Sequence, residues 1–469
     1  MKTRSDEKNR ITEFLNDLST NVCICTGRLG MGKSVFLKNL VKEYQGVYFR
    51  AYPTTDTMEL KLLCTSIFVD GEYTEDEYSS IQVLMEKIKL KADEGDKRPY
   101  LLVIDNYPDF AKADSSFNKE FAESCKVLFT GTNVKVIIAG DSMLNMHKFC
   151  LDRTSPWMKL NPYIITFEKL SFLEAVKYFN VEEESDSIFM YGITGGLPVL
   201  VDKLGEESIS RQEAVKKLYL DKATDSNPEE TMKKDLREPA YYNRMMSVLA
   251  DGVQRVNEIA EIVNKPKDIV VPYLKSLMRL SLVKKETPIT EKNNRRKTRY
   301  SLCNTADVFW YKFIVPALPF YEMTGELPDI AEDDMEAFER EVFTEVCKEY
   351  LMEKSKNGSL PFVLDEVGNW WENNDEEHTT VGFDIVGLGK NEDEDASVFC
   401  ECYYSKKQVE IQELKELIEL TKKVRRMGDN FYMVFSAAGF SDHALTVASA
   451  IKNIILVDLK TVIKEAKEK

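Results

Sequence analysis

Short apolar runs alternate with amphipathic helical patterns through the first two hundred residues of the chain. Continuous apolar runs lie at Val22–Thr26, Leu101–Asp105 and Val134–Ala139, as in strands that are buried on both faces of a parallel sheet. Two further strands are expected at Val47–Ala51 and Tyr163–Phe167. Because helical patterns separate these strands, the sequence predicts an α/β fold with a doubly wound parallel sheet.

After Leu204 the pattern becomes mainly helical. Short amphipathic helices are expected at Tyr241–Leu249, Val256–Ile262 and Ile269–Leu280, and a polar, basic stretch follows them. A helix is expected from Met335 onward. The strands expected after it are Thr380–Val386, Val398–Tyr404, Phe431–Ser436 and Ile454–Asp458, and the helices are Ile411–Val424 and Ala444–Ile451. This alternation predicts a second, smaller α/β region.

The composition is that of a soluble globular protein with several cores. The 469 residues are 43% hydrophobic and carry a net charge of −16, which argues against a protein coated with nucleic acid. No run of about 18 apolar residues occurs, and the first ten residues are charged, so neither a membrane span nor a secretory signal is expected. The nine cysteines form no CxxC pair and are expected to be buried free thiols, which favours a cytoplasmic location.

A phosphate-binding motif follows the first expected strand. Its residues fit the pattern GxxxxGK[ST] and are Gly27, Arg28, Leu29, Gly30, Met31, Gly32, Lys33 and Ser34. A helix expected at Ser34–Tyr44 completes the strand–loop–helix context of a P-loop. Its backbone N–H groups suit phosphate oxygens, Lys33 suits the β- and γ-phosphates, and Ser34 suits Mg²⁺. The motif therefore predicts that the protein binds ATP with Mg²⁺.

The carboxylate that a P-loop ATPase needs near its magnesium is expected at Asp105, where a buried strand ends. Many ATPases of this type have a glutamate at the next position, which here is Asn106, and an asparagine accepts no proton at neutral pH. Asp109 either substitutes for this glutamate or is a solvated loop acid. Asp141 and Ser142 either contact the γ-phosphate or the attacking water, or form an ordinary turn. We expect tight nucleotide binding with slow hydrolysis.

The chain resembles the archaeal-type ATPases, a branch near the STAND and AAA+ P-loop NTPases. The family's Gly-Arg at the start of the P-loop matches Gly27-Arg28, and its Gly-Ser-Ser strand end corresponds to Gly140–Ser142. Its Gly-Gly-x-Pro motif, inside a helix after the fifth strand, matches Gly195–Pro198. The resemblance implies a winged helix and a restriction-endonuclease-like domain after the ATPase domain. Asn106 departs from the family, which usually has glutamate there.

The patterns and the resemblance together predict four parts of the chain. A P-loop ATPase domain with a helical lid covers residues 1–205, and a winged-helix domain covers residues 206–316. A linker rich in proline and acidic residues covers 317–334. The restriction-endonuclease-like domain covers residues 335–469.

The expected wing reverses the charge of the chain locally. It holds seven basic residues against two acidic ones. The basic residues are Lys284, Lys285, Lys292, Arg295, Arg296, Lys297 and Arg299. Such a wing either holds the phosphates of duplex DNA, or is a solvated hairpin or an intramolecular lever. The expected recognition helix lacks a cluster of Asn, Gln and Arg side chains, so no sequence specificity is expected.

In active restriction-endonuclease-like domains, an Asp on one strand and a Glu-x-Lys on the next bind Mg²⁺. The resemblance places Asp384 and Glu401 at the two carboxylate positions. Tyr403 stands at the lysine position and supplies no positive charge, while Lys406 lies just beyond it. Glu339 is a candidate third carboxylate. We expect an impaired nuclease fold that is kept for binding or scaffolding.

Three functions follow from these observations. In the first, ATP controls a switch between the ATPase core and the C-terminal modules, with DNA binding through the winged helix. The second is an ATP-dependent nuclease, and the third is a protein-interaction scaffold in which ATP is structural. The residues at positions 106 and 403 favour the first, with a slow Mg²⁺-dependent ATPase. A protein partner or an oligomer is compatible with it.

Overall fold

The chain forms two compact units in the computed structural model. One consists of Met1–Lys169 with Asp225–Pro239, and the other of Leu170–Thr224 with Ala240–Lys469. The described residues are 4–68, 80–95, 98–113, 116–205, 208–220, 228–236, 238–292, 294–374, 379–391, 394–424 and 428–468. The four-part division expected from the sequence stays a prediction. It assigns residues 170–205 to the ATPase domain, whereas they cluster with the second unit.

The first unit is built on a five-stranded sheet whose strand pairings are all parallel. The strand order is β2-β3-β4-β1-β5. The strands are β1 (Val22–Thr26), β2 (Gln45–Arg50), β3 (Tyr100–Asp105), β4 (Val134–Ala139) and β5 (Tyr163–Thr166). Every residue of β1, β3 and β4 is buried, because these three strands lie inside the sheet and are covered on both faces. The predicted parallel α/β sheet is confirmed, and β1 and β4 have the predicted bounds.

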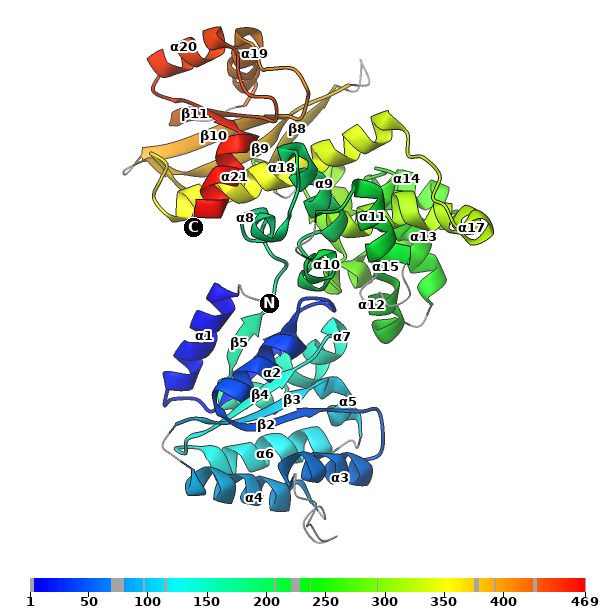
Figure 1. The fold of residues 1–469 in the computed structure, drawn as a ribbon, viewed down its shortest axis with the longest axis vertical. Coiled ribbons are helices and arrows are strands. Elements are labelled where there is room, and N and C mark those ends of the chain that lie inside the picture. Colours follow the sequence, from blue (N-terminus) through cyan, green and yellow to red (C-terminus); the bar gives the residue numbers. More distant parts are fainter. Residues whose placement is uncertain are drawn as a thin grey trace. The chain divides into compact units, whose positions relative to one another are not determined.

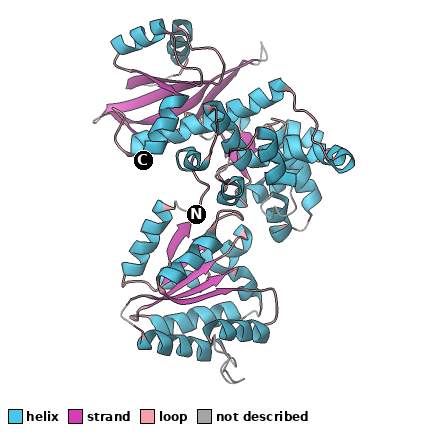
Figure 2. Ribbon diagram, viewed as in Figure 1, coloured by secondary structure: helices cyan, strands magenta, loops and turns pink. Residues whose placement is uncertain are grey.

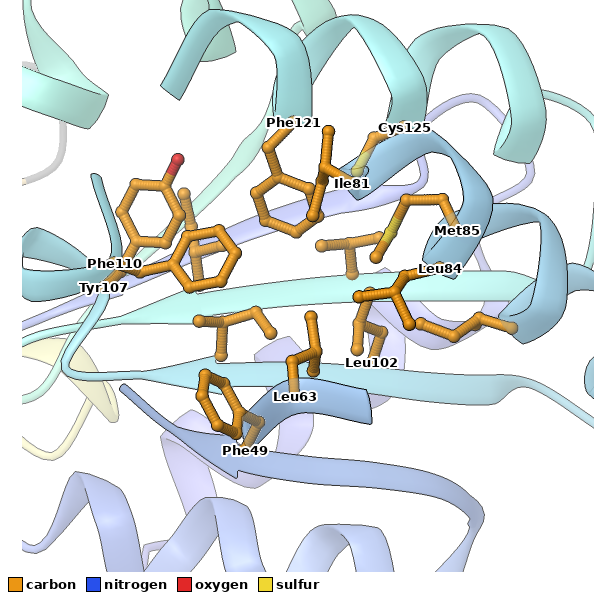
Figure 3. Close-up of a cluster of buried hydrophobic side chains, with 14 of the residues drawn as sticks. Phe49, Leu63, Ile81, Leu84, Met85, Leu102, Tyr107, Phe110, Phe121 and Cys125 are labelled. Atoms are coloured by element: carbon orange, nitrogen blue, oxygen red, sulfur yellow. The ribbon is translucent and has the colours of Figure 1, made fainter. Parts of the chain in front are cut away.

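Helices cover both faces of this sheet (Figure 1). The helices of this unit are α1 (Ser5–Asn16), α2 (Lys33–Glu43), α3 (Asp56–Ile67), α4 (Ile81–Glu94), α5 (Tyr107–Lys112), α6 (Phe117–Phe129), α7 (Met143–Met146) and α12 (Pro228–Asp235). Leu63, Leu84 and Phe121, from α3, α4 and α6, point toward Leu102 of the sheet in the core (Figure 3). These four side chains are fully buried, so this layer anchors the strands whose ends carry the candidate site.

The second unit begins with a helical region. Its helices are α8 (Phe172–Ala175), α9 (Glu184–Thr194), α10 (Pro198–Leu204), α11 (Arg211–Val215), α13 (Pro239–Ala250), α14 (Val256–Ile262), α15 (Lys267–Arg279), α16 (Thr305–Phe309) and α17 (Val315–Thr324). The Gly-Gly-x-Pro motif lies not within one helix but after the end of α9, and its Pro198 is the first residue of α10. Gly195 has a positive φ of 54°, and a Cβ there would lie 1.7 Å from Oδ1 of Asn304, so only glycine fits.

A two-stranded antiparallel ribbon of β6 (Val283–Glu286) and β7 (Arg299–Leu302) follows α15. Helices α13 to α15 with this ribbon fit the expected winged helix, which stays a prediction. The segment 317–334, predicted to be a linker, is helical in its first eight residues because α17 runs through it. Pro319 lies inside this helix.

The second unit ends in a mixed sheet, whose strands are drawn as magenta arrows in Figure 2. Its order is β12-β11-β10-β9-β8. The elements are α18 (Glu332–Lys356), β8 (Val363–Asn374), β9 (Thr379–Asn391), β10 (Glu394–Tyr403), α19 (Ile411–Thr421), β11 (Asp429–Ser436), α20 (Asp442–Ala450), β12 (Ile454–Asp458) and α21 (Leu459–Glu468). The strand β8 and the helix α21 are additions to the sequence-based expectation. No helix in the described ranges is both long and apolar enough to span a membrane.

Candidate nucleotide-binding site

The predicted site residues meet at one edge of the parallel sheet. The P-loop Gly27–Ser34 follows β1, Asp105 ends β3, and Asp141 follows β4. Since β4 pairs with both β1 and β3, the carboxyl ends of these three strands are neighbours. Ligands of open α/β sheets bind at this edge. The expectation that the Asp141 strand lies beside the Asp105 strand is confirmed.

The glycines of the P-loop have backbone conformations that other residues rarely adopt. The φ angles of Gly27, Gly30 and Gly32 are 147°, 87° and 75°. A Cβ on Gly27 would also lie 2.5 Å from the carbonyl oxygen of Phe167. The loop therefore turns sharply into α2, which begins at Lys33 directly after Gly32.

Lys33 is buried and its ammonium group has three oxygen partners. It donates hydrogen bonds to the carbonyl oxygens of Gly27 (2.7 Å) and Arg28 (3.0 Å). Its Nζ also lies 2.6 Å from Oδ1 of Asp141. The structure thus brings Asp141 into direct contact with the P-loop lysine. Asp141 would therefore lie close to any phosphate that Lys33 binds.

The carboxylate of Asp105 is buried and held by two donors. The hydroxyl of Tyr48 donates to Oδ2 at 2.5 Å, and the backbone N–H of Asn106 donates to Oδ1 at 2.9 Å. Burial, together with the charge and hydrogen bond of Asp105, raises the pKa of Tyr48, while a hydrogen bond with Ser34 lowers it. The Tyr48 hydroxyl therefore joins Ser34 and Asp105, the two expected magnesium ligands. Sequence reasoning missed Tyr48 because it lies on the neighbouring strand β2.

These side chains fit ATP with Mg²⁺. Ser34 and Asp105 offer hard oxygen donors, which Mg²⁺ prefers, and they are linked through a single hydroxyl group. The buried ammonium of Lys33 supplies the positive charge that phosphates require. Among the described residues, no group of three or more His, Cys, Asp or Glu side chains is placed to hold a metal ion.

The residue after Asp105 has a special backbone conformation. Asn106 has φ 58° and ψ 33°, in the left-handed region that asparagine tolerates better than most residues. Its carbonyl oxygen accepts a hydrogen bond from the N–H of Asp109 (2.9 Å) and so starts α5. The carboxylate of Asp109 lies 3.7 Å from the ammonium of Lys112. The interactions seen among the described residues do not join Asp109 to Asp105.

Glu59 is an unexpected feature near this edge. It is fully buried on α3, its Oε1 accepts the N–H of Tyr52 (3.0 Å), and its Oε2 has no hydrogen-bond partner in the described part of the chain. Burial, and to a smaller extent the charge of Asp109, raises the pKa of Glu59 from 4.5 to about 7, although the Tyr52 hydrogen bond lowers it. No sequence motif marks this residue.

We expect Glu59→Gln to stabilise the first unit above pH 7. The unfolded chain releases this proton above about pH 4.5, but the folded protein holds it to about pH 7, so the group's contribution falls as pH rises between these values. The free energy of unfolding falls by about 3 kcal/mol over this range in the wild type. The glutamine variant does not lose it, because its amide does not ionise. Urea unfolding at pH 5 and pH 8 measures the effect, with exposed Glu123→Gln as the control. If Glu59→Gln destabilised the protein equally at pH 5 and pH 8, the raised pKa of Glu59 would be disproved.

Arg4 supports the P-loop from the N-terminal side. Its buried guanidinium donates to the carbonyl oxygens of Met31 (2.6 Å) and Glu168 (2.9 Å). It also lies 5.2 Å from the centroid of the Phe167 ring. Because this contact joins residues that are far apart in the sequence, no local pattern predicts it.

Four of the seven basic residues of the wing are engaged within the second unit. The ion pairs are Lys284–Glu345 (3.1 Å), Lys292–Glu366 (2.5 Å) and Lys297–Glu291 (2.5 Å). The guanidinium of Arg299 lies 4.4 Å from the ring centroid of Trp371. Lys285, Arg295 and Arg296 are exposed. Lys292 is also exposed, although it is paired with Glu366.

The wing packs against the C-terminal sheet. The N–H of Ile289 donates to the carbonyl oxygen of Asn369 (2.9 Å). The Ile289 side chain is buried in one cluster with Trp370, Phe383 and Phe399. The expected wing is thus packed against the C-terminal sheet at Ile289.

The two carboxylates expected for a nuclease-type metal site lie on the neighbouring strands β9 and β10. Oδ2 of Asp384 accepts the N–H of Cys402 at 2.9 Å. Burial, followed by the charge and hydrogen bond of Asp384, raises the pKa of Glu401 from 4.5 to about 9. The burial of Glu401 beside Asp384 thus favours its protonated form.

The remaining groups of that expected site are engaged elsewhere. Glu339 forms an ion pair with Arg211 and accepts the hydroxyl of Tyr404 at 2.6 Å. Lys406 is exposed and lies 3.8 Å from Glu332. Glu339 has these partners in the structure, and its assignment as a candidate third carboxylate stays a prediction.

Three comparisons relate this chain to known proteins. Residues 310–415 match the DUF234 family, described as archaeal and bacterial proteins of unknown function. An uncharacterized protein of Methanocaldococcus jannaschii is 22% identical over 448 residues, covering 93% of this chain and 94% of that protein. A Walker-type ATPase of Pyrococcus abyssi has a TM-score of 0.52 and 17% identity, over 66% of this chain and 96% of that one. At this identity the likeness shows the fold, which is that of a P-loop ATPase.

Proposed function

We propose that this protein is a nucleotide-controlled switch that binds ATP with Mg²⁺ and turns it over slowly. The observation that carries the proposal is the meeting of Lys33, Asp105 and Asp141 at one edge of the parallel sheet. In this site the P-loop N–H groups and Lys33 bind the phosphates, and Ser34 and Asp105 hold the magnesium ion.

Slow turnover follows from the groups that surround the attacking water. Asn106 orients a water by hydrogen bonding but accepts no proton from it. The nearby carboxylate of Asp109 lies 3.7 Å from the ammonium of Lys112, and no interaction in the described residues joins it to Asp105. A positioned base contributes about 10²–10⁴-fold to such a step, and its absence keeps ATP intact on the protein.

The second unit is the part of the protein that the switch acts on in this proposal. Its wing joins the helical region to the C-terminal sheet through Ile289, as a lever requires. Duplex DNA is a further proposed partner, through the exposed side chains Lys285, Arg295 and Arg296. The nuclease alternative has less support, because Tyr403 occupies the lysine position beside Asp384 and Glu401.

The test is the chemical fate of bound ATP. We expect radiolabelled ATP that is bound with Mg²⁺, separated from free nucleotide and quenched with acid to be recovered as ATP after a minute. Turnover should lie at least about ten-thousandfold below the typical 10 s⁻¹. Asp105→Asn, which lowers the charge at the magnesium site, should release the nucleotide. Recovery of ADP within seconds would contradict the proposal of a slow switch.

A further inference from the structure

One segment of the chain leaves the second unit, packs with the first, and then returns. Leu170–Thr224 and Ala240–Lys469 belong to the second unit, whereas Asp225–Pro239 clusters with the first. The helix α12 in this segment contacts α7, and its Met232 is completely buried. A displacement of α12 is therefore expected to be transmitted along the backbone to α13, the helix that follows it in the second unit.

Polar side chains tie the end of α12 to the start of α7. The hydroxyl of Ser142 donates a hydrogen bond to Oδ1 of Asp235, the last residue of α12. The side-chain amide of Asn145 donates to Oγ of Ser142 (2.6 Å) and to Oδ1 of Asp235 (3.4 Å). Ser142 also caps α7, because its Oγ accepts the N–H of Asn145 at 3.3 Å. Asp235 thus fixes the first turn of α7.

This attachment lies next to the P-loop lysine. Asp141, which contacts Lys33, precedes Ser142 directly in the chain. When Lys33 turns to a phosphate, the Asp141 carboxylate loses its cation and faces groups of its own sign. A displacement of Asp141 passes to Ser142 across one peptide unit and so acts on the hydrogen bond with Asp235.

We propose that Asp235 is a positioning residue that holds Asp141 against Lys33, and that ATP binding with Mg²⁺ loosens α12 and so signals the nucleotide state to the second unit. This inference rests on the proposed ATP site. Because coupling between two equilibria is reciprocal, a protein whose α12 attachment is removed should bind ATP more tightly.

Hydrogen exchange of the α12 backbone amides, with and without ATP and Mg²⁺, tests the coupling in the full-length chain. We expect ATP to speed α12 exchange in the wild type. In Asp235→Ala the exchange should be fast with and without ATP, and ATP should bind about tenfold more tightly. Asp235→Asn, whose amide oxygen still accepts the Ser142 hydroxyl, should stay close to the wild type. Glu229→Gln, on the first turn of α12, is the matched control.

The outcomes separate this inference from the ATP site. Protection of the P-loop and α2 by ATP, with α12 exchange unchanged in the wild type, would overturn the coupling and leave ATP binding intact. Absence of protection at the P-loop would overturn the ATP site itself, and the coupling with it. Should Asp235→Ala not fold, the response of wild-type α12 exchange to ATP with Mg²⁺ decides. Unchanged ATP affinity in a folded Asp235→Ala would also contradict the coupling.

Discussion

Lys33→Ala should abolish ATP binding at micromolar nucleotide. The variant removes the buried ammonium that is aimed at the phosphates and leaves the Asp141 carboxylate without its cation. Truncating one partner of a buried charged pair costs about 2–5 kcal/mol, which corresponds to a loss of roughly 30- to 4,000-fold in affinity. Titration with a fluorescent ATP analogue in the presence of Mg²⁺ measures this loss.

The control for this variant is Lys42→Ala, which removes an exposed lysine from the same helix. It should bind the analogue as the wild type does. An affinity of Lys33→Ala within about threefold of the wild type would show that the nucleotide, if bound, lies elsewhere. That result would remove the basis of the proposed switch, since every assignment at this edge of the sheet depends on Lys33.

Asn106→Glu should raise ATP turnover by about ten- to a hundredfold. The substitution places a carboxylate directly after Asp105, where it can accept a proton from the attacking water. The expected gain is smaller than the full effect of a general base, because glutamate is strained at the positive φ of 58°. The measurement is phosphate release per minute at saturating ATP.

Asn106→Gln separates chemistry from strain. Glutamine has the length of glutamate and meets the same backbone strain, but its amide accepts no proton. It should therefore turn ATP over at or below the wild-type rate. Equal rates for the glutamate and glutamine variants would mean that position 106 does not limit hydrolysis, and that Asp109 or another carboxylate serves as the base.

The P-loop and the strand ends were predictable because their signals are local. The glycines and Lys33 stand in one short motif, and Asp105 and Asp141 each follow a continuous apolar run. Such runs form the inner strands of the sheet, where both faces are buried, so β1 and β4 have the predicted bounds. Parallel pairing then brings the three carboxyl ends to one edge.

The partners of these residues were not predictable, because they come from distant segments. Tyr48 reaches Asp105 from β2, and Asp235 reaches Ser142 from a segment that is ninety-three positions away in the sequence. Glu59 lies inside an ordinary amphipathic helix, and only the packing of α3 shows that its carboxyl group is buried. Tertiary contacts decide these roles, and single-sequence patterns do not contain them.

The strand β8 was missed for a different reason. Its sequence VLDEVGNWWENN contains acidic and amide residues and no continuous apolar run. Its pairing with β9 shifts register between Leu364 and Glu366 and again between Gly368 and Trp370. Such irregularities break the alternation of inward and outward side chains that marks a strand in a sequence. The packing of Ile289 against this sheet was hidden with it.

The central claim is that the edge formed by the P-loop, Asp105 and Asp141 binds ATP with Mg²⁺. Isothermal titration of the wild-type protein with ATP, with Mg²⁺ and then with EDTA in its place, tests it most directly. We predict one ATP per chain, bound with micromolar or better affinity in Mg²⁺ and markedly more weakly in EDTA, because Ser34 and Asp105 hold the metal. No heat of binding in either condition, or identical affinity in both, would contradict the claim.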